Sequence, residues 1–141
     1  MKFILLLWLA LTSPSTWAET VTLHLGAHRI QAEIANTPYS RERGLMQRSH
    51  LCADCGMLFV FPRAGRVNFW MKNTPLPLSI AFIDAEGAIL NIEEMQPHTT
   101  AAHHPSGQVL YALEMPSGWF IKKGIKPGNR IENLAHVPQG Q

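Results

Sequence analysis

Met57-Leu58-Phe59-Val60-Phe61 is an unbroken apolar run that Pro62 closes. Its length fits a β-strand that is buried on both faces. Segments on either side of it along the chain alternate between apolar and polar residues, at 21–25, 29–35 and 109–115. Such alternation is typical of strands with one buried face. The run therefore predicts a buried strand within a mainly β domain.

Further strands are expected at 67–71, 76–83, 88–95 and 130–134, and the longest polar loop at 96–107. Gly26-Ala27 indicates a tight turn between the first two strands. Thr37 suits a helix N-cap and Pro38 the first helical position, so a short helix is expected over 38–48, weakened by Gly44. A second helical turn is expected at 119–123. The pattern predicts a mainly β fold, an antiparallel β-sandwich or barrel-like sheet with one or two short helices.

The first 18 residues have the order of a secretory signal peptide. Lys2 precedes an apolar run from Phe3 to Leu11, and a site with small residues ends at Ala18. The run is too short to span a bilayer, which needs about 20 apolar residues. We expect cleavage after Ala18, a single domain over 19–141, and a periplasmic or secreted protein with no stable membrane anchor.

The charge balance argues against nucleic acid as a partner. The formal net charge is only +2, and positive and negative residues are interspersed along the chain. A nucleic-acid binder carries a basic stripe with a larger surplus of charge. Export argues against that class independently.

Several short segments together carry a resemblance to a known family. They are Arg43-Gly44-Leu45-Met46, Gly56-Met57-Leu58-Phe59-Val60-Phe61, Phe69-Trp70-Met71-Lys72-Asn73-Thr74, Ile80-Ala81-Phe82-Ile83-Asp84, Gly87 and Tyr111-Ala112-Leu113-Glu114. The chain resembles domain of unknown function 192 (DUF192), a prokaryotic family of small, often exported domains. The resemblance implies a compact β-sandwich-like domain and no particular activity. The two cysteines depart from the family pattern, so a function common to the family should not depend on them.

Phe69 to Thr74 is the first candidate for a binding wall. Alternation would send Trp70 and Lys72 to one side, because successive strand residues point to opposite faces. Trp70 could then serve as an aromatic platform, Lys72 as a charge for an anion, and Asn73 as an amide donor and acceptor. The alternative is a core strand that ends in a turn made by Asn73.

Glu114 is the second candidate, because it lies in an otherwise apolar strand. A carboxyl that points inward needs a partner, and Lys72, Arg43 or Arg48 would serve. Such a pair could belong to a binding site or be a structural ion pair.

Cys52 and Cys55 are the only cysteines of the chain. In an oxidising compartment they favour a structural disulfide, although the same spacing occurs in thiol oxidoreductases. A metal site built from these cysteines with His50, His98, His103 and His104 is the remaining alternative, but no pair has zinc-finger spacing. We therefore predict no metal ligands and no cofactor.

Three functional hypotheses follow. The first is a non-enzymatic binding module for a small polar or anionic ligand, or for an envelope protein partner, with Trp70, Lys72, Asn73, Glu114 and Arg48 as candidate ligand-binding residues. The second is an enzyme of unrecognised type that uses Lys72 or Glu114 in proton transfer. The third is metal or thiol chemistry at Cys52, Cys55 and the histidines. No catalytic residue is assigned, because no hydrolase motif is present.

Overall fold

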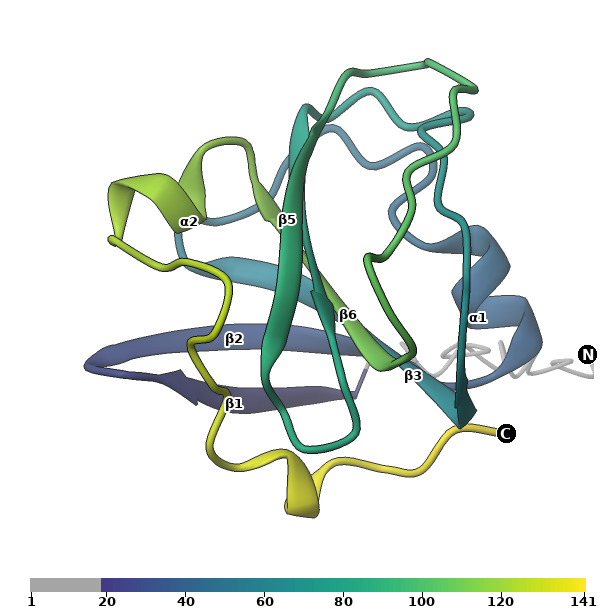
Figure 1. The fold of residues 1–141 in the computed structure, drawn as a ribbon. Coiled ribbons are helices and arrows are strands. Elements are labelled where there is room, and N and C mark those ends of the chain that lie inside the picture. Colours follow the sequence, from purple (N-terminus) through teal and green to yellow (C-terminus); the bar gives the residue numbers. More distant parts are fainter. Residues whose placement is uncertain (1–18) are drawn as a thin grey trace, which may run out of the picture.

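A computed structural model describes residues 19–141 of the chain (Figure 1). The signal peptide predicted for residues 1–18 lies outside the described residues. Six strands form one sheet, in the order β1-β2-β3-β6-β4-β5. Their bounds are β1 Thr20–Leu25, β2 His28–Ala35, β3 Cys55–Gly65, β4 Leu78–Ile83, β5 Ile89–Met95 and β6 Val109–Pro116. The helices are α1 Pro38–Arg43, α2 Trp119–Lys122 and a 3-10 turn at Leu134–His136.

The expected mainly β class with two short helices is confirmed, but the sheet is mixed rather than wholly antiparallel. Strands β2 and β3 pair in parallel, with Ile34 opposite Leu58, while the other four neighbouring pairs are antiparallel. A parallel pair needs a crossover connection of about a dozen residues or more. Residues 36–54 supply it and contain α1. The sheet is open between β1 and β5 and does not close into a barrel.

The sheet is apolar on both faces, which explains the continuous run in β3. Leu58 and Val60 point to one face and Met57 and Phe59 to the other. The first face packs against α2 and the C-terminal segment, and we call it the α2 face. The second packs against Leu45, which follows α1, and against residues 67–78; we call it the α1 face. Figure 1 shows α1 and α2 on opposite sides of the sheet.

Helix α1 begins as expected and ends earlier than expected. The Thr37 hydroxyl accepts from the Ser40 N–H while the Ser40 hydroxyl accepts from the Thr37 N–H, which is a capping box. The helix stops at Arg43 because Gly44 adopts φ +46° and ψ −131°, a conformation open to glycine. A Cβ at Gly44 would also lie 3.2 Å from the Phe59 ring.

Two expected strands are wrong. Residues 67–71 form only an isolated bridge, between Phe69 and His103, and residues 130–134 form isolated bridges at Arg130 and Ile131. Instead β3 continues through Pro62 to Gly65, with a shift of register after Val60. An irregular strand end tolerates proline, which cannot donate to the sheet.

Residues 67–74 are held in place by the polar loop 96–107 rather than by the sheet. The N–H of Phe69 donates to His103 O and the N–H of His103 donates back to Phe69 O, at 3.1 and 2.8 Å. The N–H of Met71 donates to Thr99 O.

No helix within residues 19–141 is long and apolar enough to cross a membrane.

Candidate functional site

A cavity of about 340 Å³ opens on the α1 face, between α1, β3 and residues 67–74. Ligand pockets in proteins commonly have volumes of about 300–1,000 Å³. Three parts of the chain that are distant in sequence meet there, together with β6. The cavity is lined by Arg41, Glu42, Arg43, Gly44, Leu45, Met46, Phe59, Phe61, Val67, Asn68, Phe69, Trp70, Thr74 and Glu114.

Glu114 forms the floor of this cavity and is only 4% exposed. It stands in β6 directly between Met57 of β3 and Ile80 of β4, so its side chain shares their face of the sheet. Alternation along β6 puts Leu113 and Met115 on the α2 face and Glu114 on the α1 face. A carboxyl group is thus flanked by apolar side chains.

No described residue gives the Glu114 carboxyl a hydrogen bond or an ion pair. Among residues 19–141, no side-chain oxygen or nitrogen is both sealed from solvent and unbonded. The carboxyl oxygens of Glu114 therefore face the open space of the cavity. Burial raises the pKa of Glu114 to about 8, because desolvation disfavours the charged form. At neutral pH the group is mostly a neutral acid that can donate a hydrogen bond.

Aromatic rings form the walls above this carboxyl. The Phe69 ring packs edge-to-face on Phe59 at 4.9 Å between centroids, on Phe82 at 5.8 Å and on Phe61 at 6.3 Å. Such edge-to-face pairs are a preferred geometry for aromatic side chains. The walls are therefore apolar and made of rings that pack on one another. Thr74, also buried, turns its hydroxyl towards Lys72 O at 3.1 Å.

The charged C-terminal residues of α1 lie at the mouth of the cavity: Arg41, Glu42 and Arg43. The Arg41 guanidinium donates to Val60 O and Gln141 O, at 3.0 and 2.7 Å. It lies 5.4 Å from the centre of the Phe61 ring. Burial lowers the pKa of Arg41. The Arg43 side chain is exposed, and its guanidinium makes no hydrogen bond or ion pair with the described residues. Glu42 adds one exposed carboxylate.

The structure brings together only two of the five residues predicted to bind a ligand. Trp70, 48% exposed, and Glu114 both line the cavity, whereas Lys72, Asn73 and Arg48 do not. The Lys72 ammonium lies 5.2 Å from the centre of the Trp70 ring, a cation–π contact at the rim. Asn73 holds a turn at φ +54°, and its carbonyl accepts from the Gln47 N–H at 2.7 Å.

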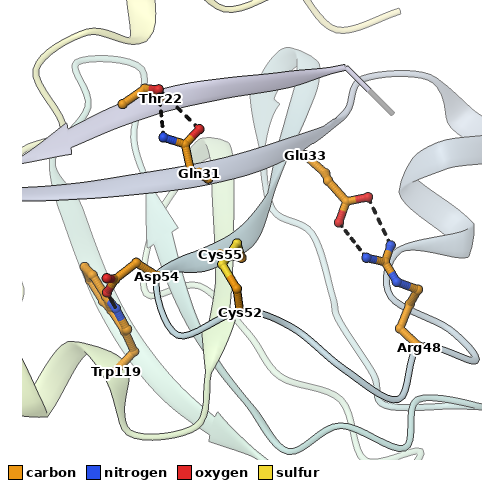
Figure 2. The surroundings of a disulfide bond; sticks show 8 residues. All are labelled: Thr22, Gln31, Glu33, Arg48, Cys52, Asp54, Cys55 and Trp119. Carbon is orange, nitrogen blue, oxygen red and sulfur yellow. Dashed lines mark hydrogen bonds and ion pairs between the residues drawn. A yellow bond between two sulfur atoms is a disulfide. The ribbon is translucent and has the colours of Figure 1, made fainter. Parts of the chain in front are cut away.

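The partners suggested for an inward Glu114 are therefore wrong. Lys72 stays on the Trp70 ring, and Arg48 forms a bidentate ion pair with Glu33 at 3.0 and 2.9 Å (Figure 2). The hydrogen bonds that Arg48 donates to Glu33 raise the pKa of Arg48; desolvation opposes this rise, and the negative charge of Glu33 adds to it. Arg43 lines the cavity but does not pair with Glu114.

Cys52 and Cys55 form a disulfide in the turn that leads into β3 (Figure 2). The same turn contacts α2, because Asp54 accepts from the Trp119 Nε1–H at 2.9 Å. Its backbone oxygen also accepts from the Gln31 N–H. The disulfide thus lies beside the α2 face and outside the cavity. Strand β3 follows it directly, whereas a helix follows the cysteine pair in thiol oxidoreductases.

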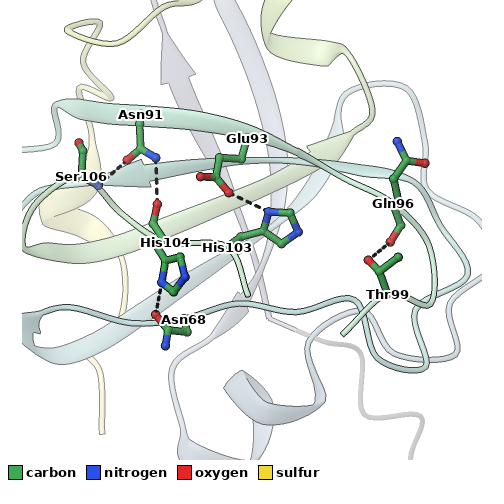
Figure 3. Close-up of polar contacts among 8 residues, drawn as sticks. All are labelled: Asn68, Asn91, Glu93, Gln96, Thr99, His103, His104 and Ser106. Carbon is green, nitrogen blue, oxygen red and sulfur yellow. Dashed lines mark hydrogen bonds and ion pairs between the residues drawn. The ribbon is translucent and has the colours of Figure 1, made fainter. Parts of the chain in front are cut away.

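The side chains of His103 and His104, in the long loop, contact neighbouring polar groups (Figure 3). The Nδ1 of His103 lies 2.7 Å from Glu93 Oε2, and the Nδ1 of His104 lies 2.8 Å from Asn68 Oδ1. Asn91 donates to His104 O. Within residues 19–141, no three His, Cys, Asp or Glu side chains gather in a geometry that could hold a metal ion. These contacts hold residues 67–74, which form part of the cavity wall, against β5.

Sequence reasoning missed most of the aromatic wall and both arginines of the mouth as ligand-facing groups. The signal for Arg43 was present in the segment Arg43-Gly44-Leu45-Met46, where Gly44 marks a close approach. Nothing in the sequence around Arg41 singles it out.

Comparison with protein families identifies the domain that carries this site. The model of DUF192, described as an uncharacterized ACR, matches residues 20–133. The chain belongs to the DUF192 family. All residues that line the cavity lie within the matched range.

Two solved structures are similar to this DUF192 protein. A candidate transcription regulator from Sinorhizobium meliloti is 39% identical over 80% of this chain and 91% of its own, with a TM-score of 0.75. A protein of unknown function from Novosphingobium aromaticivorans is 30% identical over 85% of this chain and 89% of its own, with a TM-score of 0.80. No curated protein matches the chain.

Proposed function

We propose that this DUF192 protein is a non-enzymatic module that binds a small molecule in the cavity above Glu114. The observation that carries the proposal is the buried, unpartnered carboxyl on the cavity floor. Moving a carboxyl from bulk water into apolar surroundings costs free energy, and the raised pKa of Glu114 reflects that cost. An apolar residue at this position would avoid that cost. A bound ligand that accepts a hydrogen bond from the carboxyl would explain why a glutamate stands there.

The lining of the cavity supports the same proposal. The segments that carry the family resemblance, such as Arg43-Gly44-Leu45-Met46 and Phe69-Trp70, meet at this one place although they are far apart in the sequence. Apolar walls with a few polar groups are typical of small-molecule sites.

Binding is favoured over catalysis because the lining offers few reactive groups. It contains no Ser, Cys or His, and its single hydroxyl, on Thr74, already donates to Lys72 O. Lys72, the second group that an acid–base mechanism was expected to use, lies outside the cavity. The net charge of +2 is small for a nucleic-acid binder. It argues against a role in transcription regulation such as that named for the Sinorhizobium meliloti protein.

Export to the periplasm or beyond is the second part of the proposal. The pattern of residues 1–18 supports it, with the apolar run from Phe3 to Leu11 followed by Ala18. A disulfide is also compatible with an oxidising compartment. Mass spectrometry of the protein isolated from cells tests this part: a chain that begins at Glu19 supports export, and a chain that keeps Lys2 contradicts it.

The binding function is tested by screening a fragment library by NMR with isotope-labelled protein. We expect fragments to shift the backbone amides of Gly44, Phe69 and Thr74, which line the cavity. Glu114→Leu should change the set of fragments that bind while the protein stays folded. A library in which no fragment shifts these amides would contradict the proposal.

A further inference from the structure

We propose that the ligand of this cavity is a small amphiphilic anion: an acidic group that meets Arg43 at the mouth, an apolar or aromatic body between the phenylalanines, and a hydrogen-bond acceptor that meets the Glu114 carboxyl at the floor. This inference rests on the proposed binding function and specifies the chemistry of the ligand. It depends on the order of side chains along the cavity: charged residues at the mouth, aromatic rings in the walls and the Glu114 carboxyl at the floor.

The mouth favours an anion. Among the lining residues, Arg41 and Arg43 stand against the single exposed carboxylate of Glu42. The Lys72 ammonium on the Trp70 ring adds a further positive charge at the rim. A cationic ligand would enter against this surplus, because like charges repel at short range.

Arg43 is the residue available to hold the anion. The guanidinium of its neighbour Arg41 is already bound to Val60 O and Gln141 O. Arg43 has no such partner among residues 19–141, and a guanidinium offers five donors in a planar fork that suits carboxylate or phosphate. Its position at the end of α1 is fixed by the glycine turn that follows.

The floor calls for an acceptor rather than a second anion. Apolar Met57 and Ile80 flank Glu114 in the sheet, and no described cation pairs with it. In those surroundings the group keeps its proton at neutral pH, so it presents an O–H donor. A carbonyl or ether oxygen accepts that bond without bringing a charge into the apolar interior.

The body of the ligand is set by the walls and the volume. Phe59, Phe61 and Phe69 leave a space of about 340 Å³, near the lower end of ligand pockets. A single ring or short chain fits such a space. Edge-to-face contacts with these rings would favour an aromatic body.

The test uses para-acetylphenylacetate, which has an acidic group, a ring and a carbonyl acceptor in this order. Three matched probes each change one property. Para-acetylphenylacetamide lacks the charge, para-ethylphenylacetate lacks the acceptor, and para-acetylbenzyltrimethylammonium reverses the charge. Dissociation constants are measured at neutral pH from the amide shifts of Gly44 and Thr74, residues of the cavity.

Two variants assign the two ends. We expect the parent probe to bind at least about tenfold more tightly than each matched probe, as a charge-assisted or buried hydrogen bond provides. Arg43→Gln should abolish the preference for acid over amide, and Glu114→Leu the preference for acetyl over ethyl. Arg63→Gln, an exposed arginine outside the cavity, is the control and should change neither.

The outcomes separate the two proposals. Equal binding of acid and amide, tighter binding of the ammonium probe, or preferences that survive in the variants would overturn the anionic ligand while leaving a small-molecule pocket. If none of the four probes and no library fragment shifts the amides of the cavity residues, the binding function itself is overturned.

Discussion

The two faces of the sheet are built from the same alternating strands, yet only one of them is completed by its own chain. On the α2 face, Trp119, Phe120 and the C-terminal segment cover the apolar residues, and the Trp119 N–H is bound by Asp54. On the α1 face, the covering residues leave a cavity with an unpartnered carboxyl. The α2 face thus provides stability, whereas the α1 face gives up stability to keep the Glu114 carboxyl available.

Removal of a side chain from the α2 face should have the largest effect. Phe120 is 1% exposed, so Phe120→Ala leaves a cavity and should lower the free energy of unfolding by about 3–5 kcal/mol. Phe61→Ala, on the wall of the existing cavity, should cost clearly less. Urea unfolding monitored by circular dichroism compares the two, and equal losses would contradict the difference between the faces.

The pH dependence of stability should reveal the cost of the α1 face. Glu114 has a pKa of about 8 in the folded protein against 4.5 ordinarily. Below pH 4.5 both states hold the proton; between 4.5 and 8 the unfolded chain loses it while the folded chain keeps it, so stability falls as pH rises. At about 1.4 kcal/mol per pKa unit, the fall amounts to a few kcal/mol.

Glu114→Gln should remove this fall and be more stable than the parent protein near pH 8. Urea unfolding at a series of pH values measures it. Glu132→Gln, an exposed carboxyl, is the matched control and should keep the parent profile. Parallel profiles for the parent and Glu114→Gln would sink the idea that burial holds the proton.

The disulfide should stabilise without affecting the cavity. Cross-linking so short a loop stabilises by about 2 kcal/mol in the chain-entropy model. Replacing Cys52 and Cys55 by Ser should therefore lower the unfolding free energy by about 2 kcal/mol, because the unfolded chain regains the entropy that the closed loop removes. Fragment binding measured by NMR should be unchanged; loss of binding in the folded variant would tie the disulfide to the site.

The cap of α1 should have the smallest effect, and on the α1 face alone. Thr37→Ala removes the capping box and should cost about 1 kcal/mol. Hydrogen exchange should accelerate at Arg41 and Gly44, whose N–H groups bond Thr37 O and Ser40 O, but not at Lys123, bonded to Trp119 O beside the α2 face. Uniform acceleration at all three would indicate a global loss.

Much of the fold was predictable from local patterns. The period-two alternation of β6 correctly separated Leu113 and Met115 from Glu114, and Thr37-Pro38 marked the helix start. The expected strand at 67–71 was wrong because Phe69 and Met71 are apolar for a different reason: they close the α1 face and bond the loop 96–107. Apolar alternation cannot tell a strand from a covering segment.

The candidate site was only partly predictable. Trp70 was singled out as an aromatic platform and Glu114 as an isolated carboxyl in apolar surroundings. Their meeting depends on the loop 96–107, which holds residues 67–74 in place, and the approach of α1 depends on the parallel β2–β3 pair and its crossover. That pairing also brings Arg43 to the mouth and leaves Arg48 with Glu33. Such partners follow from long-range topology, which sequence spacing does not encode.

The most direct test of a protonated carboxyl kept open to a ligand is a carbon-13 NMR titration of the glutamate carboxyl carbons, with Glu114→Gln for assignment. We expect one carboxyl that titrates near pH 8 and is missing in the variant. A Glu114 carboxyl that titrates near its ordinary value of 4.5 would contradict it.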